Sequence, residues 1–256
     1  LDDPTPLRRA VNGCDFVSHC AGFYPRFTDR RELAIARGIE QTRRIFECLR
    51  TPQVSRIVYT SSAATIGPVI GRPSTEADGE SWPLAHWRAL YATVKIAMEH
   101  IVLRYANEGL PVIIVNPSVC LGEYDAHPFS GRLALLFAKG RLPVYLEHPL
   151  NVVYTGDVGQ GHVLAAERGR PGERYLLTGE NLTLGELSRL IATEAGVRPP
   201  RWRIPYSVAL IASMMTELVA ALTRREPLLP RQVIQMSRHG HRLDGSKARR
   251  ELDLPQ

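Results

Sequence analysis

The amino-acid sequence predicts an α/β protein with a doubly wound parallel sheet, meaning that helices cover both faces of the sheet. Two observations predict this class. Short runs rich in valine and isoleucine alternate with longer stretches of helical periodicity, as in consecutive strand–helix–strand units. The runs are almost continuously apolar, which is typical of strands that are buried on both sides. At 256 residues the chain is long enough to form such a core.

The elements follow one another regularly through the first half of the chain. We expect strands within residues 14–22, 55–63 and 111–118, and helices over about residues 30–50 and 87–107. After residue 118 the pattern is less regular, and the tail is mostly helical. We therefore expect a main domain from residues 1–122 and 151–178, and a small, mostly helical lobe from residues 123–150 and 179–256.

The longest apolar run of the chain, Ser207–Leu222, lies in this helical tail. It is interrupted by Glu217 and is shorter than the ~20 residues that span a bilayer. We therefore expect a helix packed within the lobe, and no membrane span.

Charge and cysteine content narrow the classes of function. The net charge is +6, but the arginines are spread along the chain and no nucleic-acid recognition motif is present, so we expect no nucleic-acid partner. The four cysteines form no CxxC pair, which argues against a zinc site or a disulfide framework and suits the cytoplasm. His86, His127 and His162 lack metal-ligand spacing, so no metal is expected. His19 is expected to pack in the core.

The stretch "YATVK" places Tyr91 and Lys95 one helical turn apart, on the same face of the predicted helix. A free tyrosine is a poor base, with a pKa near ~10, but a nearby ammonium favours the phenolate and lowers that pKa. Such a pair can move a proton to or from a substrate hydroxyl. The alternative is an amphipathic helix in which Tyr91 is half-buried and Lys95 extends along the surface.

Hydroxyl-bearing residues follow two of the predicted strands. "YTSSA" ends the second strand, and "VNPS" ends the third. Open α/β sheets bind ligands at the carboxyl ends of their strands, and a hydroxyl of Thr60, Ser61 or Ser62 there can donate to a substrate oxygen. The alternative for these serines is a turn or a helix cap. Pro117 breaks the sheet, and we expect it to leave the backbone of Ser118 and Val119 free to meet a ligand.

Taken in order, "DFVSHCAG", "RIVYTSSA", "YATVK" and "VIIVNPS" resemble the extended short-chain dehydrogenase/reductase superfamily, in its epimerase/dehydratase branch. The later stretches "GRLPVYLEHPLNVVYTGDVGQG" and "LDGSKARREL" are most similar to hopanoid-associated sugar epimerases and dihydroflavonol reductase-like proteins. The resemblance runs from Leu1 to Gln256. It implies a Rossmann-like sheet, an NAD or NADP cofactor, hydride transfer, and a lobe that binds a small-molecule substrate.

The resemblance also implies roles for single residues. Tyr91 matches the acid/base tyrosine, Lys95 its partner that orders the nicotinamide ribose, and Ser62 the donor to the substrate oxygen. The cofactor-binding residues implied are Ala21, Gly22, Thr60, Ser61, Tyr91, Lys95, Pro117, Ser118 and Val119. The residues expected to face the substrate are Phe23, Tyr24, Ser62 and Arg132.

The chain departs from the family pattern in two places. The family begins with a strand and a glycine-rich turn that binds the pyrophosphate, so the resemblance implies an N-terminally truncated chain that lacks about 55 residues before Leu1. Gly156–Gly161 has the intervals of that turn reversed, and we expect a helix start capped by Asp157 instead. Gly38 and Gln41 stand where the family usually has Asn and Gly, which argues against a proton relay or a cofactor-positioning role for that helix.

The leading hypothesis is an NAD(P)-dependent oxidoreductase or epimerase that acts on a hydroxyl or carbonyl of a sugar or sugar nucleotide. One alternative is a ketone reductase for a polyketide- or flavonoid-like compound. Another is a non-catalytic binding module that keeps the site residues by descent. A homodimer is possible, with residues 35–49 and 94–105 as candidate interface helices. The choice between NAD and NADP depends on a residue after the second strand of the fold, which the resemblance places before Leu1.

Overall fold

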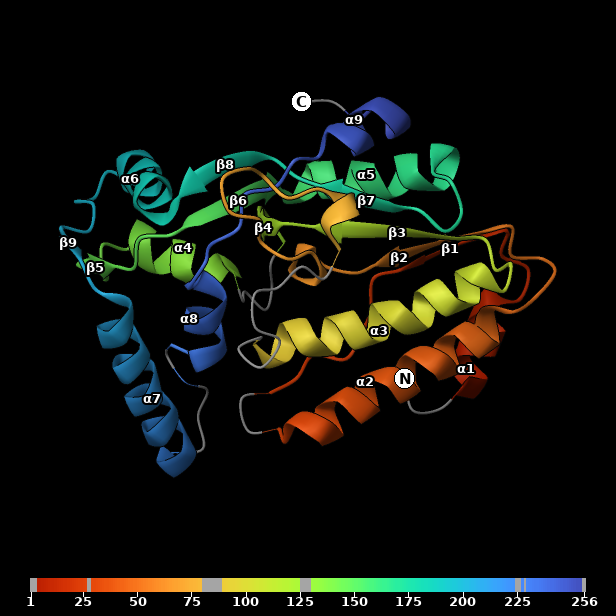
Figure 1. Ribbon diagram of the computed structural model, residues 1–256, viewed down its shortest axis with the longest axis horizontal. Helices are drawn as coiled ribbons and strands as arrows, with labels where there is room; N and C mark the ends of the chain where they lie inside the picture. The colour runs from red at the N-terminus through yellow and green to blue at the C-terminus, as the bar shows by residue number, and fades with distance from the viewer. Residues whose placement is uncertain are drawn as a thin grey trace.

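The computed structural model describes residues 4–26, 29–79, 89–124, 130–223, 227 and 229–254. Its centre is a parallel four-stranded sheet in the order β1–β2–β3–β7. The strands are β1 (Phe16–His19), β2 (Arg56–Thr60), β3 (Val112–Pro117) and β7 (Arg174–Leu177). The helices α2 (Arg31–Leu49) and α3 (Leu90–Asn107) cover one face of this sheet, and α5 (Thr155–Arg168) and α9 (Ser246–Leu252) cover the other (Figure 1). The predicted fold class is confirmed.

Alternate residues of the central strands build the two halves of the core, because successive side chains of a strand point to opposite faces. Ile57 and Ile114 pack in the cluster that includes α2 and α3. Val58 and Ile113 pack in the cluster that includes α5 and α9. All six residues of β3 are buried, as the continuous apolar run predicts. His19 is buried against Phe46 and Tyr59, as expected of a core histidine.

The remaining elements lie around this centre. The helix α1 (Pro4–Val11) packs against α2, and of two 3-10 helices η1 (Ala63–Thr65) lies against α3 and β3 and η2 (Glu76–Asp78) lies against β7. A second sheet has the order β4–β6–β8, with β4 (Val119–Leu121), β6 (Pro149–Tyr154) and β8 (Glu180–Thr183). The strands β5 (Val144–Tyr145) and β9 (Trp202–Arg203) pair with each other. Four more helices are α4 (Ser130–Ala138), α6 (Leu184–Glu194), α7 (Tyr206–Thr223) and α8 (Arg231–Ser237).

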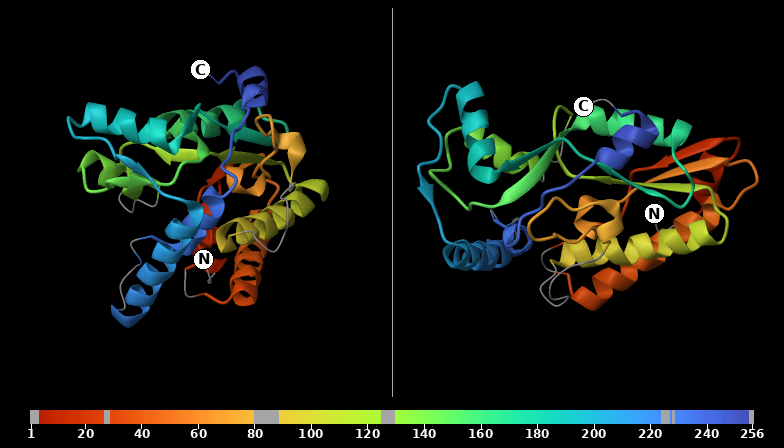
Figure 2. Two further views of the ribbon diagram at one scale, coloured as in Figure 1. Left: turned by 60° about the vertical axis from the view of Figure 1, so that its left-hand side comes forward. Right: turned by 45° about the horizontal axis from the view of Figure 1, so that its top comes forward.

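The helices α4, α6, α7 and α8 lie together with β5 and β9 at one end of the molecule (Figures 1 and 2). Phe137, Leu150 and Leu184 form a small buried cluster there. The predicted boundary at residue 179 is inexact, because α9 returns to the four-stranded sheet. Ala248 and Leu252 are buried in the same cluster as Val58. The last helix therefore belongs with the sheet and not with the lobe.

Two further expectations are wrong. Asp157 lies in the first turn of α5, whereas the N-cap residue is Tyr154, because β6 runs directly into the helix. The apolar run Ser207–Leu222 forms α7, but only Ala209, Ser213 and Ala220 of that helix are buried. The helix is therefore not packed inside the lobe. Apolar composition predicted burial, but composition does not determine which helices find a partner surface.

Candidate active site

The start of α3 is held in place by close packing against α2. Gly38 of α2 faces Val94 and Met98 of α3, and a Cβ atom at Gly38 would lie 3.0 Å from Cγ1 of Val94. The glycine therefore lets the two helices approach closely. This packing gives Gly38 a structural role. It also fixes the helix turn that carries Tyr91 and Lys95.

Tyr91, Ser62 and Lys95 meet at the carboxyl ends of β2 and β3. The Ser62 hydroxyl forms a hydrogen bond with the Tyr91 phenol. The Nζ atom of Lys95 lies 6.0 Å from the centre of the Tyr91 ring. The geometry therefore brings together the three residues that the sequence singled out for catalysis.

The pKa of Tyr91 differs from the one that the sequence predicted. Burial raises the pKa of Tyr91, and the hydrogen bond from Ser62 opposes this only in part. Burial also lowers the pKa of Lys95, against the opposing charge of Glu99. The expected lowering of the tyrosine pKa by the ammonium is therefore wrong for this arrangement. The free-energy cost of removing a phenolate from water is larger than the stabilisation that the neighbouring groups provide. Tyr91 is a neutral phenol at neutral pH.

Glu99 is a residue that the sequence reasoning missed. It is buried one turn after Lys95 and joins several elements. Its carboxylate accepts hydrogen bonds from Thr65 at 3.1 Å and from Nδ2 of Asn116 at 2.8 Å, and it forms an ion pair with Nε of Arg174 at 2.9 Å. Ser61 donates to the same carboxylate. The sequence did contain a signal for Glu99, because residues 91, 95 and 99 are spaced four apart and therefore lie on one face of the helix.

The two hydroxyls expected to bind cofactor before Ser62 have partners inside the protein. Ser61 is buried and bonded to Glu99. Thr60 Oγ1 lies 2.7 Å from Nε2 of His162, whose Nδ1 lies 2.7 Å from the carbonyl oxygen of Val158. Of the three hydroxyls, Ser62 is the one bonded to Tyr91.

Cys20 and His162 form a second polar cluster beside this site, which the sequence reasoning also missed. A hydrogen bond with His162 lowers the pKa of the Cys20 thiol to about 6, with partial burial opposing and Ser18 and Thr60 contributing further hydrogen bonds. Burial lowers the pKa of His162, but its bonds to Cys20 and to the Val158 carbonyl raise that pKa overall. Cys20 is exposed, so its thiolate is accessible.

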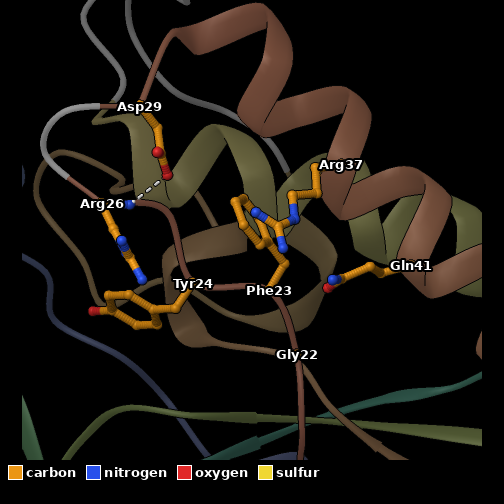
Figure 3. A pocket seen from close by; sticks show the side chains of 7 residues that line it. All are labelled: Gly22, Phe23, Tyr24, Arg26, Asp29, Arg37 and Gln41. Carbon is orange, nitrogen blue, oxygen red and sulfur yellow. Dashed lines mark hydrogen bonds between the residues drawn. The ribbon is translucent and has the colours of Figure 1, made fainter. Parts of the chain in front are cut away.

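A cavity of about 460 Å³ opens after β1, lined by Gly22, Phe23, Tyr24, Arg26, Asp29, Arg37 and Gln41 (Figure 3). The Tyr24 ring lies beside Tyr91, with 4.9 Å between ring centres. The Arg37 guanidinium lies 5.3 Å from the centre of the Phe23 ring. Phe23 and Tyr24 therefore border a cavity next to Tyr91, and their contact with a substrate stays a prediction. Arg132 lies on α4, outside the lining of this cavity.

The turns after β1 and β3 offer places for a dinucleotide. Ala21 and Gly22 are exposed, and Gly22 lies close to α3, since a Cβ atom there would be 3.3 Å from Cε of Met98 and 3.7 Å from Nζ of Lys95. Ser118 Oγ is buried and has no hydrogen-bond partner within the described residues, which suits a ligand amide. The backbone is less free than expected, because the Ser118 N–H donates to the Leu177 carbonyl and Val119 pairs with Val152. These residues fit a nicotinamide dinucleotide.

No group of three metal-ligating side chains exists among the residues that the structure describes. His86 and His127, which the sequence analysis considered, lie outside those residues. His162 is engaged with Thr60 and Val158.

The parallel sheet and the site at the carboxyl ends of its strands are typical of dinucleotide-dependent α/β enzymes. Comparison with known families agrees. The model of the NAD dependent epimerase/dehydratase family matches residues 1–178, and the chain belongs to this family.

Similar proteins cover nearly the whole chain. A Synechocystis protein that carries the name dihydroflavonol 4-reductase is 32% identical over 98% of this chain and 74% of its own length. Sterol demethylase protein B of Methylococcus capsulatus is 33% identical over 99% of this chain and 78% of its own length. A solved nucleoside-diphosphate-sugar epimerase from Pseudomonas aeruginosa is 30% identical, with a TM-score of 0.75, over 99% of this chain and 74% of that one.

Proposed function

We propose that this protein reduces a ketone of a small molecule with NAD(P)H, and that Tyr91 supplies the proton. The observation that carries the proposal is the contact of Ser62 with a neutral Tyr91 beside Lys95. A phenol that holds its proton at neutral pH is the form needed to protonate an oxygen as a carbonyl is reduced. Oxidation of a hydroxyl needs the phenolate, which burial disfavours here.

Each residue has a defined task in this proposal. Ser62 donates to the carbonyl oxygen and orients it toward the Tyr91 phenol. Lys95, as a compact ammonium, stabilises the phenolate left after proton transfer and can also donate to a ribose hydroxyl. Gly22, Lys95 and Ser118 are the residues that would hold the dinucleotide. When bound, the cofactor supplies the hydride.

The surroundings of Tyr91 favour a substrate with an apolar or aromatic body. The rings of Tyr24 and Phe23 border the cavity next to the phenol. The names of the two curated relatives, a dihydroflavonol 4-reductase and a sterol demethylase protein, also refer to ring systems with large apolar surfaces.

Epimerisation of a sugar nucleotide, the leading hypothesis from the sequence, is the second candidate function. Arg26 and Arg37 line the same cavity, and guanidinium groups are well suited to bind phosphates. The Pseudomonas aeruginosa structure that is 30% identical is named as an epimerase of this kind.

The test follows the oxidation of NADH and NADPH with a panel of cyclic and aromatic ketones, beside an epimerisation assay with nucleoside-diphosphate sugars. We expect ketone-dependent oxidation that Tyr91→Phe reduces by about 100-fold or more. Tyr105→Phe is the matched control, because it removes a phenol hydroxyl whose partner is Glu47, away from the site. Epimerisation without ketone reduction would establish the second candidate instead. Nucleotide binding without turnover in either assay would support a non-catalytic module.

A further inference from the structure

Seven large apolar side chains of α7 are exposed, with exposed fractions between 49% and 78%. They are Val208, Ile211, Met214, Met215, Leu218, Val219 and Leu222. In Figure 1 this helix extends away from the rest of the molecule, with α8 as its neighbour. Soluble proteins rarely leave so long an apolar surface without a partner, so this one requires an explanation.

The exposed residues lie on one side of the helix. At 100° per residue, the seven positions fall within an arc of about 140°. The three buried residues, Ala209, Ser213 and Ala220, lie outside that arc and are small. The helix thus turns its small residues toward the protein and its large apolar residues outward, which is the reverse of an ordinary surface helix.

The residues of β9 and its flank, which precede α7, are of the kinds found at the boundary of a bilayer. Trp202 is 60% exposed and stands between two exposed arginines, Arg201 and Arg203. Tryptophan is enriched at membrane–water interfaces, and arginines there attract anionic headgroups. The sequence continues after the helix with Arg224 and Arg225, so both ends of the run are basic. The net charge of +6 also favours attraction to anionic headgroups.

Hydrogen bonds along one side of α7 attach it to the rest of the protein, which argues against a helix that crosses a bilayer. Within the described part of the chain, α7 is the one helix whose length and composition would suffice to cross a membrane. However, Glu217 accepts a hydrogen bond from the Arg231 backbone at 2.8 Å, and Thr216 donates to the Leu229 carbonyl at 2.9 Å. These bonds attach one side of α7 to the segment that leads into α8. Glu217 lies outside the apolar arc, so no charge interrupts that face.

We propose that α7 docks the protein on the surface of an anionic lipid bilayer, with its exposed apolar face inserted at the level of the headgroups. A helix with an apolar face and basic flanks binds such surfaces through both buried area and charge. A second copy of the chain is a less suitable occupant, because pairing two α7 faces would bring their basic flanks together, and the acidic residue of the helix, Glu217, lies outside the paired face and is bonded to Arg231. This inference does not depend on the reaction that the protein catalyses.

The test measures co-flotation of the protein with vesicles of phosphatidylcholine alone and of phosphatidylcholine mixed with phosphatidylglycerol. We expect binding to the mixed vesicles, weaker binding at high salt, and a blue shift of Trp202 fluorescence on binding. The triple variant Ile211→Ser, Leu218→Ser, Leu222→Ser is expected to lose about tenfold or more in affinity. The matched control Leu33→Ser, Val163→Ser, Leu190→Ser removes equally exposed apolar side chains elsewhere and is expected to bind as the unmodified protein does.

Circular dichroism establishes that both variants are folded, and light scattering after size exclusion gives their mass. Equal loss of binding in both variants would overturn the proposal, as would absence of binding to either vesicle. Equal binding to the two vesicle types would overturn the role of anionic headgroups. If the unmodified protein were a dimer that bound no vesicles, and the α7 variant were a monomer, the apolar face of α7 would be the contact surface for a second copy of the chain.

Discussion

At the scale of single residues, burial decides the chemistry of Tyr91. The same phenol in water would have a pKa near ~10, and a neighbouring ammonium would lower it. In the folded protein, desolvation outweighs the hydrogen bond from Ser62, and the charge of Cys120 acts in the same direction as burial, so the pKa rises. The spacing of Tyr91 and Lys95 was visible in the sequence, but the depth at which they lie was not.

The thiol of Cys20 is expected to react at unusually low pH. A pKa lowered to about 6 means that the thiolate predominates above that pH and is lost as the pH falls through it. We expect iodoacetamide to label Cys20 with a rate midpoint near that pH, and His162→Gln to move the midpoint upward because the hydrogen bond to the histidine is lost. Labelling of Cys14, followed by peptide mapping in the same samples, is the internal comparison. Indistinguishable pH profiles for Cys14 and Cys20 would refute the assignment.

The buried carboxylate of Glu99 is expected to be important for stability. Glu99→Gln keeps the shape but leaves Arg174 without its charge partner, and breaking a buried pair in this way costs about 3–5 kcal/mol. Urea denaturation measures the free energy of unfolding. Glu108→Gln is the control, since its ion pair with Arg50 is exposed, and such pairs contribute about 0–1 kcal/mol. Equal effects of the two changes would show that the Glu99 network is not stabilising.

At the scale of elements, the contact between α2 and α3 shows how two helices position the catalytic turn. Gly38 allows a close approach, because a larger residue would require the side chains of Val94 and Met98 to shift. Propensity alone would favour alanine over glycine within a helix by about 1 kcal/mol. The packing against Val94, a stiff side chain that is fully buried, opposes that gain.

Gly38→Ala is therefore expected to destabilise the protein by about 1 kcal/mol, because overpacking outweighs helix propensity. It is also expected to lower kcat by moving the start of α3. The matched change is Gly159→Ala in α5, where a Cβ atom would meet nothing within 4 Å, so stability should increase. Thermal unfolding of the two variants measures both effects. Stabilisation by both changes would mean that α2 and α3 have room to separate.

At the scale of the whole molecule, the sequence was most informative where a pattern is local. Apolar runs identified β1, β2 and β3 of the central sheet, and the family resemblance pointed to Ser62 among the hydroxyls that follow β2. Contacts between distant segments were not visible, which is why Glu99 with Arg174 and Cys20 with His162 were missed. The exposure of α7 and the return of α9 to the sheet depend on which surfaces meet, and periodicity does not encode that. The dimer through α2 and α3 stays a prediction.

The central claim is that Tyr91 acts as a protonated acid in a ketone reduction. The measurement that tests it most directly is the pH dependence of kcat/KM for NAD(P)H-dependent reduction. Because the pKa of Tyr91 is raised, the phenol is protonated across neutral pH, and the rate should be constant there and fall only in the alkaline range. The small residual rate of Tyr91→Phe should lack that alkaline fall. A rate that instead increases with pH through neutrality would contradict the account, since it would require the phenolate.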